Sequence, residues 1–133
     1  MEVTPLIKHT SKRLSAAWAG VCGDYAEYHY DDTSARESGF PAAVVNGKLL
    51  AACLTQLMTN WIGERGILHR IACQYRRLHI VGETLTCMGR VTDKYSKGDQ
   101  HLVGCEIWIE NPKREKGTLG SAIVSLPSRC SSR

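Results

Sequence analysis

The sequence predicts a single α+β domain over residues 1–133, in which an antiparallel sheet wraps around one long central helix at about residues 48–62. Two observations support this fold class. One long apolar segment has helical periodicity, and the chain after it alternates with a period of two, in runs that turn-forming residues separate. An antiparallel sheet with one apolar face needs a cover, and the apolar helix from Lys48 to Ile62 is suited to provide it.

The N-terminal third predicts two short helices. Residues 9–20, HTSKRLSAAWAG, are rich in helix-favouring alanines, with Thr10 placed to cap the first turn and Gly23 to end the segment. Residues 31–41, DDTSARESGFP, contain Asp32 as a second capping residue. The Gly-Phe-Pro at the end of this segment closes the helix after one or two turns.

The long helix is expected to begin after the pair Asn46-Gly47. Asn-Gly is also a favoured hairpin turn, but the pattern that follows is helical and asparagine is a favoured N-cap, so we interpret the pair as a helix start. Gly63 is the expected stop, which gives a length of roughly 22 Å. The apolar positions on one face are Leu50, Cys53, Leu54, Leu57, Met58 and Trp61.

After this helix the segments are rich in β-branched and aromatic residues and alternate in hydrophobicity. Val103, Cys105, Ile107 and Ile109 alternate with more mixed positions, which predicts one buried face for that strand. We therefore expect a meander of four long strands. They are at residues 68–81, 83–95, 100–111 and 117–127.

Composition and charge exclude several classes of protein. With 43% hydrophobic and 23% charged residues the chain is an ordinary globular protein, and a net charge of +4 is too mild to predict a nucleic-acid partner. No apolar run is long enough for a membrane helix and the N-terminus lacks the order of a signal peptide, so we expect a cytoplasmic protein without membrane association. A modest group of cations in the middle third suits the phosphates of a small ligand or of nucleic acid, but solvated strand faces and turns are the favoured interpretation for most of its members. It comprises Arg70, Arg76, Arg77, Arg90, Lys94 and Lys97.

Six cysteines raise the question of metal or disulfide chemistry. No two are spaced C-x-x-C and no two histidines are three to five residues apart, so we expect no metal site and free, mostly buried thiols. A nucleophilic role for Cys22 is disfavoured, because it follows a helix C-terminus whose dipole opposes a thiolate. Phosphate-binding loops and serine-hydrolase motifs are also missing from the sequence.

The chemically distinctive stretch is CGDYAEYHYDD, residues 22–32, which places Asp24 five residues before His29. A carboxylate and an imidazole joined by a short loop are able to hold one water between them, and such a pair suits the addition of water across a double bond. In the alternative interpretation the histidine only fixes the loop by a hydrogen bond to the aspartate. Residue type and spacing alone favour this alternative.

A longer match around this stretch favours the interpretation of Asp24 and His29 as a pair that activates water. Residues 23–52, GDYAEYHYDDTSARESGFPAAVVNGKLLAA, resemble the MaoC-like, or (R)-specific enoyl-CoA hydratase, family, and residues 73–91, CQYRRLHIVGETLTCMGRV, resemble its strand-turn-strand unit. The resemblance extends from about Val3 to Val124 and implies a hot-dog fold. The positions that match the family motif in order and spacing are Gly23, Asp24, His29, Ala35, Gly39, Phe40 and Gly47.

The resemblance implies roles for individual residues. Asp24 and His29 would activate water for addition to a trans-2-enoyl thioester, or for the reverse dehydration of an (R)-3-hydroxyacyl thioester. The substrate would be carried on coenzyme A or an acyl carrier protein, with no other cofactor. The backbone N–H of Gly47 would stabilise the charge that develops on the thioester oxygen. The family also implies a homodimer, or a heterodimer with another hot-dog subunit.

The chain departs from the family motif at three places. Ala26-Glu27 replaces the Asn-Pro between the catalytic residues, and Asn46 replaces a histidine. Ala51-Ala52 stands early in the long helix, where many relatives have a serine within reach of the catalytic aspartate. Two alternatives therefore stay open beside an active hydratase: a non-catalytic or acyl-binding subunit of a heteromeric hydratase and, less favoured, a thioesterase. The residues expected to contact the substrate are Tyr25, Tyr28, Asn46 and Arg76.

Overall fold

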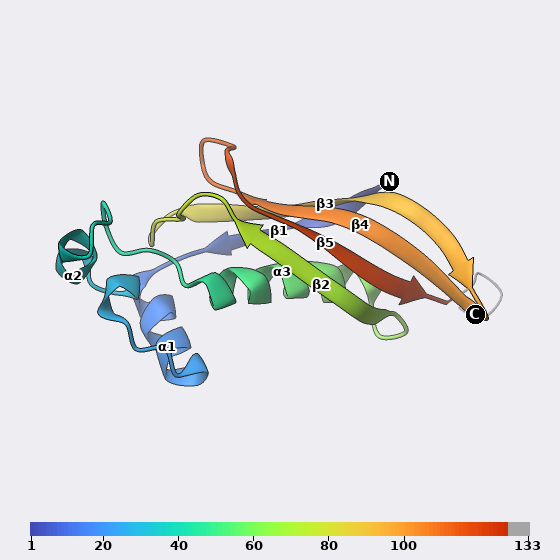
Figure 1. The fold of residues 1–133 in the computed structure, drawn as a ribbon, viewed down its shortest axis with the longest axis horizontal. Coiled ribbons are helices and arrows are strands. Elements are labelled where there is room, and N and C mark those ends of the chain that lie inside the picture. Colours follow the sequence, from blue (N-terminus) through green and yellow to red (C-terminus); the bar gives the residue numbers. More distant parts are fainter. Residues whose placement is uncertain (128–133) are drawn as a thin grey trace.

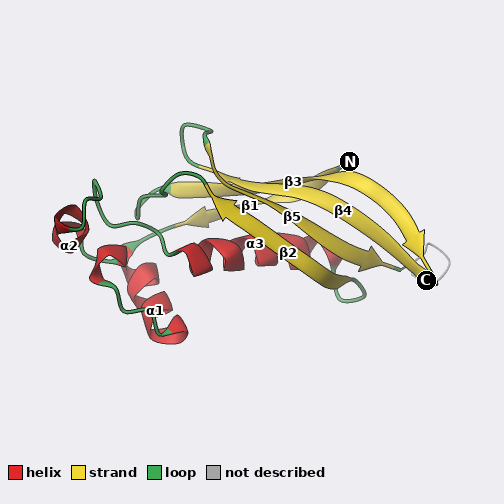
Figure 2. Ribbon diagram, in the orientation of Figure 1, coloured by secondary structure: helices red, strands yellow, loops and turns green. Residues whose placement is uncertain are grey.

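A curved, five-stranded antiparallel sheet wraps around one long helix in the structure, a computed structural model that describes residues 1–127 (Figure 1). Helix α3 runs along the concave face of the sheet, and the short helices α1 and α2 lie beyond its N-terminal end (Figure 2). This arrangement confirms the predicted α+β architecture. The elements are β1 (Glu2–His9), α1 (Lys12–Cys22), a 3₁₀ turn (Glu27–His29), α2 (Asp32–Glu37), α3 (Gly47–Ile62), β2 (Ile67–Tyr75), β3 (Thr84–Lys97), β4 (Gln100–Glu110) and β5 (Lys116–Leu126).

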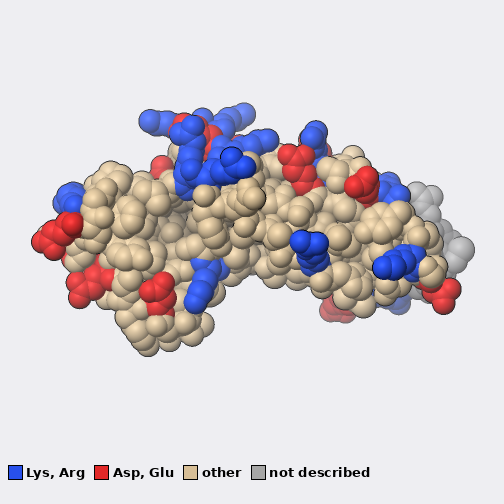
Figure 3. Space-filling model, in the orientation of Figure 1, with Lys and Arg blue, Asp and Glu red and all other residues tan. Residues whose placement is uncertain are grey.

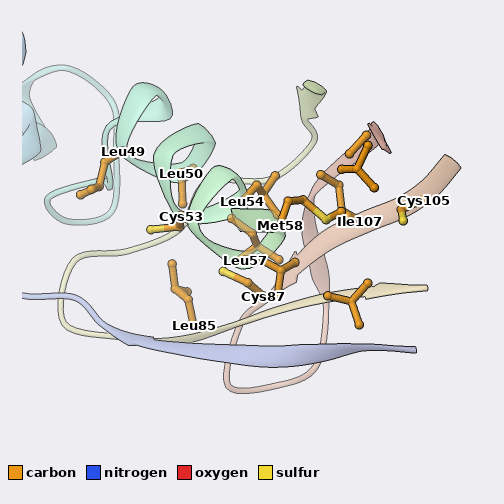
Figure 4. Packing of buried hydrophobic residues seen from close by; sticks show 14 of the residues in the cluster. Leu49, Leu50, Cys53, Leu54, Leu57, Met58, Leu85, Cys87, Cys105 and Ile107 are labelled. Atoms are coloured by element: carbon orange, nitrogen blue, oxygen red, sulfur yellow. The ribbon is translucent and has the colours of Figure 1, made fainter. Parts of the chain in front are cut away.

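The hydrophobic core lies between α3 and the sheet, as Figure 4 shows. Leu54, Leu57 and Met58 project from α3 and are completely or almost completely buried. Ile107 and Ile109 face them from β4, as the alternation in that strand predicts. Each such side chain contributes roughly 1.5–3 kcal/mol on full burial, so the packing of α3 is a main source of stability.

The start of α3 agrees closely with the sequence-based expectation. Asn46 is the N-cap, and its Oδ1 accepts a hydrogen bond from the backbone N–H of Lys48 at 2.7 Å. At the other end the N–H of Gly63 donates to the carbonyl of Thr59, and Gly63 has a φ of 71°, a conformation that glycine adopts readily. The helix is therefore bounded by the two residues that the sequence suggests.

The predicted caps of the two short helices are each wrong by one residue. Ser11, not Thr10, caps α1, because the Thr10 hydroxyl donates to the carbonyl of Glu83 instead. Asp31 caps α2, while Asp32 forms an ion pair with Lys12 at 2.8 Å. In both places a tertiary contact has taken the neighbouring polar side chain away from the helix end.

Strand β1 was not expected from the sequence. Pro5 interrupts its apolar pattern, and a proline cannot donate a hydrogen bond to a neighbouring strand. The structure accommodates Pro5 where the pairing of β1 with β3 is irregular, between Val3 and Leu6, at the edge of the sheet. A bulge at an edge strand is one of the few places where a sheet tolerates proline.

The predicted four-stranded meander is correct only for β3, β4 and β5. Strand β2 pairs with β5 rather than β3. Between β2 and β3 the chain therefore crosses the sheet, from the edge formed by β2 to the position beside β1 at the opposite edge. The run predicted at residues 68–81 also ends early, at Tyr75. The backbone N–H groups of Arg76 and Arg77 both donate to the carbonyl of Gly117, which ends the regular ladder there.

Five of the six cysteines lie among the described residues, and these five are free thiols. Cys53, Cys87 and Cys105 are buried among apolar side chains of the core. Cys130 lies outside the described residues.

Candidate active site

Asp24 follows directly after α1, in a loop that Gly23 turns away from the helix. Its Oδ1 accepts a hydrogen bond from the backbone N–H of Ala26 at 3.2 Å, and its Oδ2 accepts one from Nδ2 of Asn46 at 2.9 Å. The Ala26 donor has the largest effect, and together these donors hold the pKa of Asp24 below its ordinary value. The side chain is therefore an ionised carboxylate at neutral pH.

His29 is buried at the end of the 3₁₀ turn, with both ring nitrogens in defined surroundings. Nδ1 lies 2.9 Å from the carbonyl oxygen of Val44. Because a carbonyl oxygen only accepts hydrogen bonds, Nδ1 has to carry a proton. Nε2 lies 3.5 Å from Oδ2 of Asp24, so the second ring nitrogen is directed at the carboxylate.

The Ala26-Glu27 departure does not disturb this placement. The backbone N–H of His29 donates to the carbonyl of Ala26, and that of Tyr30 donates to Glu27, so the turn closes without a proline. The Glu27 side chain is exposed, and its carboxylate accepts a hydrogen bond from the hydroxyl of Ser34. It therefore lies away from the Asp24–His29 pair and adds no second carboxylate to it.

Gly47 is the first residue of α3 and lies under the ring of Tyr75. The Tyr75 hydroxyl donates to the carbonyl of Gly47 at 2.7 Å, and a Cβ added at Gly47 would be 3.2 Å from the tyrosine ring. The close approach of this ring thus explains the glycine. The N–H of Gly47 is in the first turn of α3, where backbone N–H groups have no acceptor within the helix.

A cavity of about 220 Å³ brings His29 and Gly47 together. Most of its wall is aromatic or aliphatic, with an arginine and a second histidine, His79, as further polar members. The wall combines the 3₁₀ turn, the segment before α3, the first turn of α3 and the chain after β2. The lining residues are Tyr28, His29, Phe40, Val44, Val45, Gly47, Leu50, Tyr75, Arg77, Leu78 and His79.

The residues predicted to contact substrate are placed differently from one another. Tyr28 lines the cavity, and its ring centroid is 4.4 Å from that of His29. Tyr25 is 66% exposed and does not line the cavity. Asn46 is buried and binds Asp24. Arg76 lies outside the wall and donates to the side chain of Gln74.

Several cavity residues are not among those that the sequence predicts to contact the substrate. Arg77, the immediate neighbour of Arg76, lines the cavity and forms an ion pair with Glu115 at 3.0 Å. His79 is completely buried, and burial lowers the pKa of its imidazole. In the sequence His79 is a polar residue among Leu78, Ile80 and Val81, and the strand predicted over residues 68–81 gives that position no distinct role.

Residues 1–127, the part that the structure describes, contain neither a candidate metal site nor a helix suited to span a membrane. Within this range no group of three or more histidine, cysteine, aspartate or glutamate side chains is arranged to hold a metal ion. Over the same range, none of the helices combines the length and the hydrophobicity needed to span a membrane.

Solved structures with the same architecture include two hydratases. The (R)-hydratase from A. caviae involved in PHA biosynthesis has 23% sequence identity and a TM-score of 0.85, covering 96% of this chain and 95% of that one. R-hydratase PhaJ1 from Pseudomonas aeruginosa has 20% identity and a TM-score of 0.86, covering 96% and 80%. The ChsH1-ChsH2 complex from Mycobacterium tuberculosis has 17% identity and a TM-score of 0.84, covering 96% of each chain. These likenesses confirm the predicted hot-dog fold.

Comparison at the level of sequence identifies the family. No curated protein sequence matches the chain. The family model described as MaoC like domain matches residues 3–107, a range that contains Asp24, His29 and Gly47 together with every residue of the cavity wall. Because this match covers well over half of its 133 residues, the chain belongs to the MaoC-like domain family.

Proposed function

We propose that the protein is a hydratase or dehydratase of 2-enoyl and (R)-3-hydroxyacyl thioesters, with Asp24 and His29 activating the water. Membership of the MaoC-like family supports hydratase-type chemistry. One observation carries the assignment of residues: Oδ2 of Asp24 lies 3.5 Å from Nε2 of His29, and His29 shares the wall of a mostly apolar cavity with Gly47.

The proposed step uses His29 as a base, which requires the neutral ring. In that form its proton is on Nδ1, facing the carbonyl of Val44, and Nε2 presents a lone pair toward the ionised Asp24, so neither facing atom has a proton to donate. A water that donates one O–H to each atom satisfies both acceptors. Its oxygen lone pairs are then free to attack a carbon in the cavity.

The proposed hydration adds the two parts of this water to the double bond. The water oxygen bonds to C3 of the enoyl group while His29 Nε2 takes the proton, and the π electrons move into the thioester carbonyl to form an enolate. The imidazolium then returns the proton to C2, so both residues recover their starting state. Asp24 stays ionised throughout and stabilises the imidazolium. Dehydration is the same path in reverse, and neither direction uses a cofactor.

The N-terminus of α3 supports the charged intermediate of this path. The enolate oxygen carries negative charge, and the first N–H groups of a helix point at an anion without an internal partner. Gly47 is the residue of the helix start that lines the cavity. Removing one such donor typically lowers the rate about a hundredfold to a thousandfold, so this group is a large part of the proposed mechanism.

A basic surface beside the cavity suits a carrier with phosphate groups. Arg76 and Arg77 follow β2, and their N–H groups bind Gly117 at the start of β5. The adjoining loop between β4 and β5 adds Lys113 and Arg114, and Figure 3 shows Lys and Arg side chains gathered over this part of the molecule. Coenzyme A and the phosphopantetheine arm of an acyl carrier protein both carry phosphate, which cations bind.

The test of this function is turnover of a trans-2-enoyl-CoA, followed by loss of the absorbance of the conjugated thioester. We expect activity in the unmodified protein and its loss in Asp24→Asn and His29→Ala. Tyr25→Phe, in the same loop but outside the cavity, serves as the control and should stay active. Failure of the unmodified chain to hydrate any enoyl-CoA or enoyl carrier protein would refute an active hydratase.

A second candidate is a subunit that completes a partner's site. It is favoured by the likeness to chains solved as two-component complexes, among them ChsH1-ChsH2 and the HadBC complex of Mycobacterium tuberculosis. Under this alternative the isolated chain is inactive, and activity in a mixture with its partner survives Asp24→Asn. Release of free thiol from an acyl-CoA would instead identify the less favoured thioesterase.

A further inference from the structure

We infer that the cavity admits only a short acyl group, of about four to six carbons, and that Leu50 at its floor sets this limit. The inference rests on the proposed function, because it takes the reacting thioester to lie between His29 and Gly47. It goes further by assigning the chain length of the substrate and the side chain that selects it.

The exposed fractions of the wall residues distinguish the mouth of the cavity from its floor. Tyr75 and Leu78 are each 52% exposed, so they belong to the mouth. Val44 and Leu50 are each only 3% exposed, so they belong to the floor. Leu50 stands one helical turn beyond Gly47 on the same face of α3. An acyl chain that enters past Tyr75 and reacts beside Gly47 therefore points its tail at Leu50.

The floor is closed by the protein core. Leu50 and Val45 both belong to the cluster of buried apolar side chains between α3 and the sheet, so packed core side chains lie behind them. The segment before α3 is also held in place: the N–H of Val44 donates to the carbonyl of Tyr28, and that of Val45 donates to His79. A longer tail would have to displace packed side chains, which close-packed interiors resist.

The side wall limits the width of the cavity as well. The rings of Tyr28 and Phe40 pack against each other with their centroids 5.2 Å apart, and both line the cavity. Tyr28 also packs against the ring of His29, so this wall is continuous with the reacting pair. A branched or bulky acyl group would therefore meet aromatic rings within a few bonds of the thioester.

The volume of the cavity sets the chain length. An apolar protein cavity of roughly 150 Å³ is large enough to hold benzene, a molecule of six carbons. By that measure a cavity of about 220 Å³ holds about nine non-hydrogen atoms. The thioester group, the first carbons of the acyl chain and the attacking water use more than half of these. The remaining space fits only a few further carbons.

The experiment measures kcat/KM of the unmodified protein for straight-chain trans-2-enoyl-CoA substrates of four, six, eight and twelve carbons. We expect the highest values at four to six carbons and a fall of at least about tenfold by eight carbons, since single methylenes at a closed pocket end change kcat/KM by about tenfold or more. A twelve-carbon substrate that is hydrated as efficiently as the four-carbon one would overturn the inference.

Two substitutions on α3 locate the limit at Leu50. Leu50→Ala enlarges the floor and should move the preferred length to eight carbons, whereas Leu50→Phe should favour four carbons over six. Leu57→Ala is the matched control: Leu57 is just as buried in the same helix but does not line the cavity, so its preference should not change. Circular dichroism identifies folded variants, and a folded Leu50→Ala with unchanged preference would contradict the role of Leu50.

A protein without hydratase activity would still allow the size of the cavity to be tested, by a binding experiment. If no enoyl-CoA of any length is hydrated, that function is refuted, and the cavity is then tested by calorimetric binding of butanoyl-CoA and dodecanoyl-CoA. Tighter binding of butanoyl-CoA would support the short cavity without catalysis. Equal or tighter binding of dodecanoyl-CoA would overturn it.

Discussion

Asn46 contacts both the carboxylate of Asp24 and the first turn of α3. Its Oδ1 caps α3 at Lys48, and its Nδ2 donates to Oδ2 of Asp24. One buried side chain therefore positions both the carboxylate and the helix terminus that contains Gly47. Lys48 and His29 also favour the ionised carboxylate, but more weakly than the hydrogen bonds from Ala26 and Asn46.

Replacing Asn46 by aspartate separates these two functions. Asn46→Asp keeps an oxygen that is able to cap the helix, but it removes the donor to Asp24 and places a second carboxylate beside it, which raises the pKa of Asp24. We expect kcat/KM to fall about tenfold to a hundredfold at neutral pH, because a hydrogen bond to a charged group contributes about 1.5–3 kcal/mol. The acid limb of the pH profile should move to higher pH. A fall in rate with an unshifted profile would mean that Asn46 acts on Asp24 only through the fold.

Burial of His79 makes the stability of the protein depend on pH. Burial lowers the pKa of His79 below its ordinary value of 6.5, and Glu83 opposes this effect only in part. The folded protein thus prefers the neutral ring, while the unfolded chain takes up a proton as the pH falls below about 6.5. Because the unfolded state then binds more protons, the free energy of unfolding decreases with falling pH.

The change His79→Gln tests this dependence. Urea unfolding of the unmodified protein at pH 7.5 and pH 5.5 should give a lower midpoint at the acidic pH, and the difference should shrink in His79→Gln even if the variant is less stable at both. The carboxylates with lowered pKa values, such as Asp24 and Glu115, lose their stabilising effect only at lower pH, near and below about 4. An equal pH dependence in both proteins would contradict this role of His79.

At the scale of residues, the sequence predicted the groups that are close together in the chain. Asp24, His29 and Gly47 lie within one motif, so their spacing was visible. Tyr75 and His79 reach the same cavity from the far end of β2, and no local pattern records that the fold places them beside Gly47. The pairing of Asn46 with Asp24 was likewise hidden, because a capping asparagine has a second hydrogen-bonding end whose partner depends on the tertiary structure.

At the scale of elements, local pattern predicted α3 and the alternating face of β4, because each buries one side of a regular element. The place of β2 beside β5 was not predictable in this way, since strand pairing depends on contacts between distant segments. The same pairing has a functional consequence. It joins Arg76 and Arg77 to the loop between β4 and β5 and so assembles the basic surface beside the cavity.

This basic surface is expected to bind the carrier and not the acyl group. The double change Arg76→Ala with Lys113→Ala should raise KM for an enoyl-CoA about threefold to tenfold at low salt, with kcat unchanged, because exposed ion pairs contribute up to about 1 kcal/mol each. The effect should shrink as salt is added. An enoyl-pantetheine substrate lacks the phosphates and serves as the control, so an equal rise in its KM would contradict the assignment. Lys94→Ala, at the far end of β3, should change neither.

At the scale of the whole molecule, the sheet has two unequal edges. Strand β1 forms one edge and is interrupted by Pro5 and by the irregular pairing between Val3 and Leu6, features that discourage a further strand. Strand β2 forms the other edge, contains no proline and leaves apolar Ile67 more than half exposed. An unprotected edge of this kind favours pairing with another chain, so we expect dimerisation through β2.

Sedimentation and hydrogen exchange test this expectation together. Sedimentation equilibrium should give twice the mass of the chain, with dissociation on dilution into a monomer. Exchange of backbone amides should then be slow along the outer edge of β2 in the dimer and fast there in the monomer, because pairing converts exposed N–H groups into hydrogen-bonded ones. The outer edge of β1 is the internal control and should exchange fast in both states.

Pairing at the edge formed by β2 should also affect activity. Tyr75 is the last residue of β2 and its ring packs on Gly47, so pairing of β2 would stabilise the position of this ring at the mouth of the cavity. We therefore expect kcat/KM to fall when dilution separates the chains. A dimer protected only at β1, or a rate per chain that is independent of dilution through dissociation, would contradict this coupling between assembly and site.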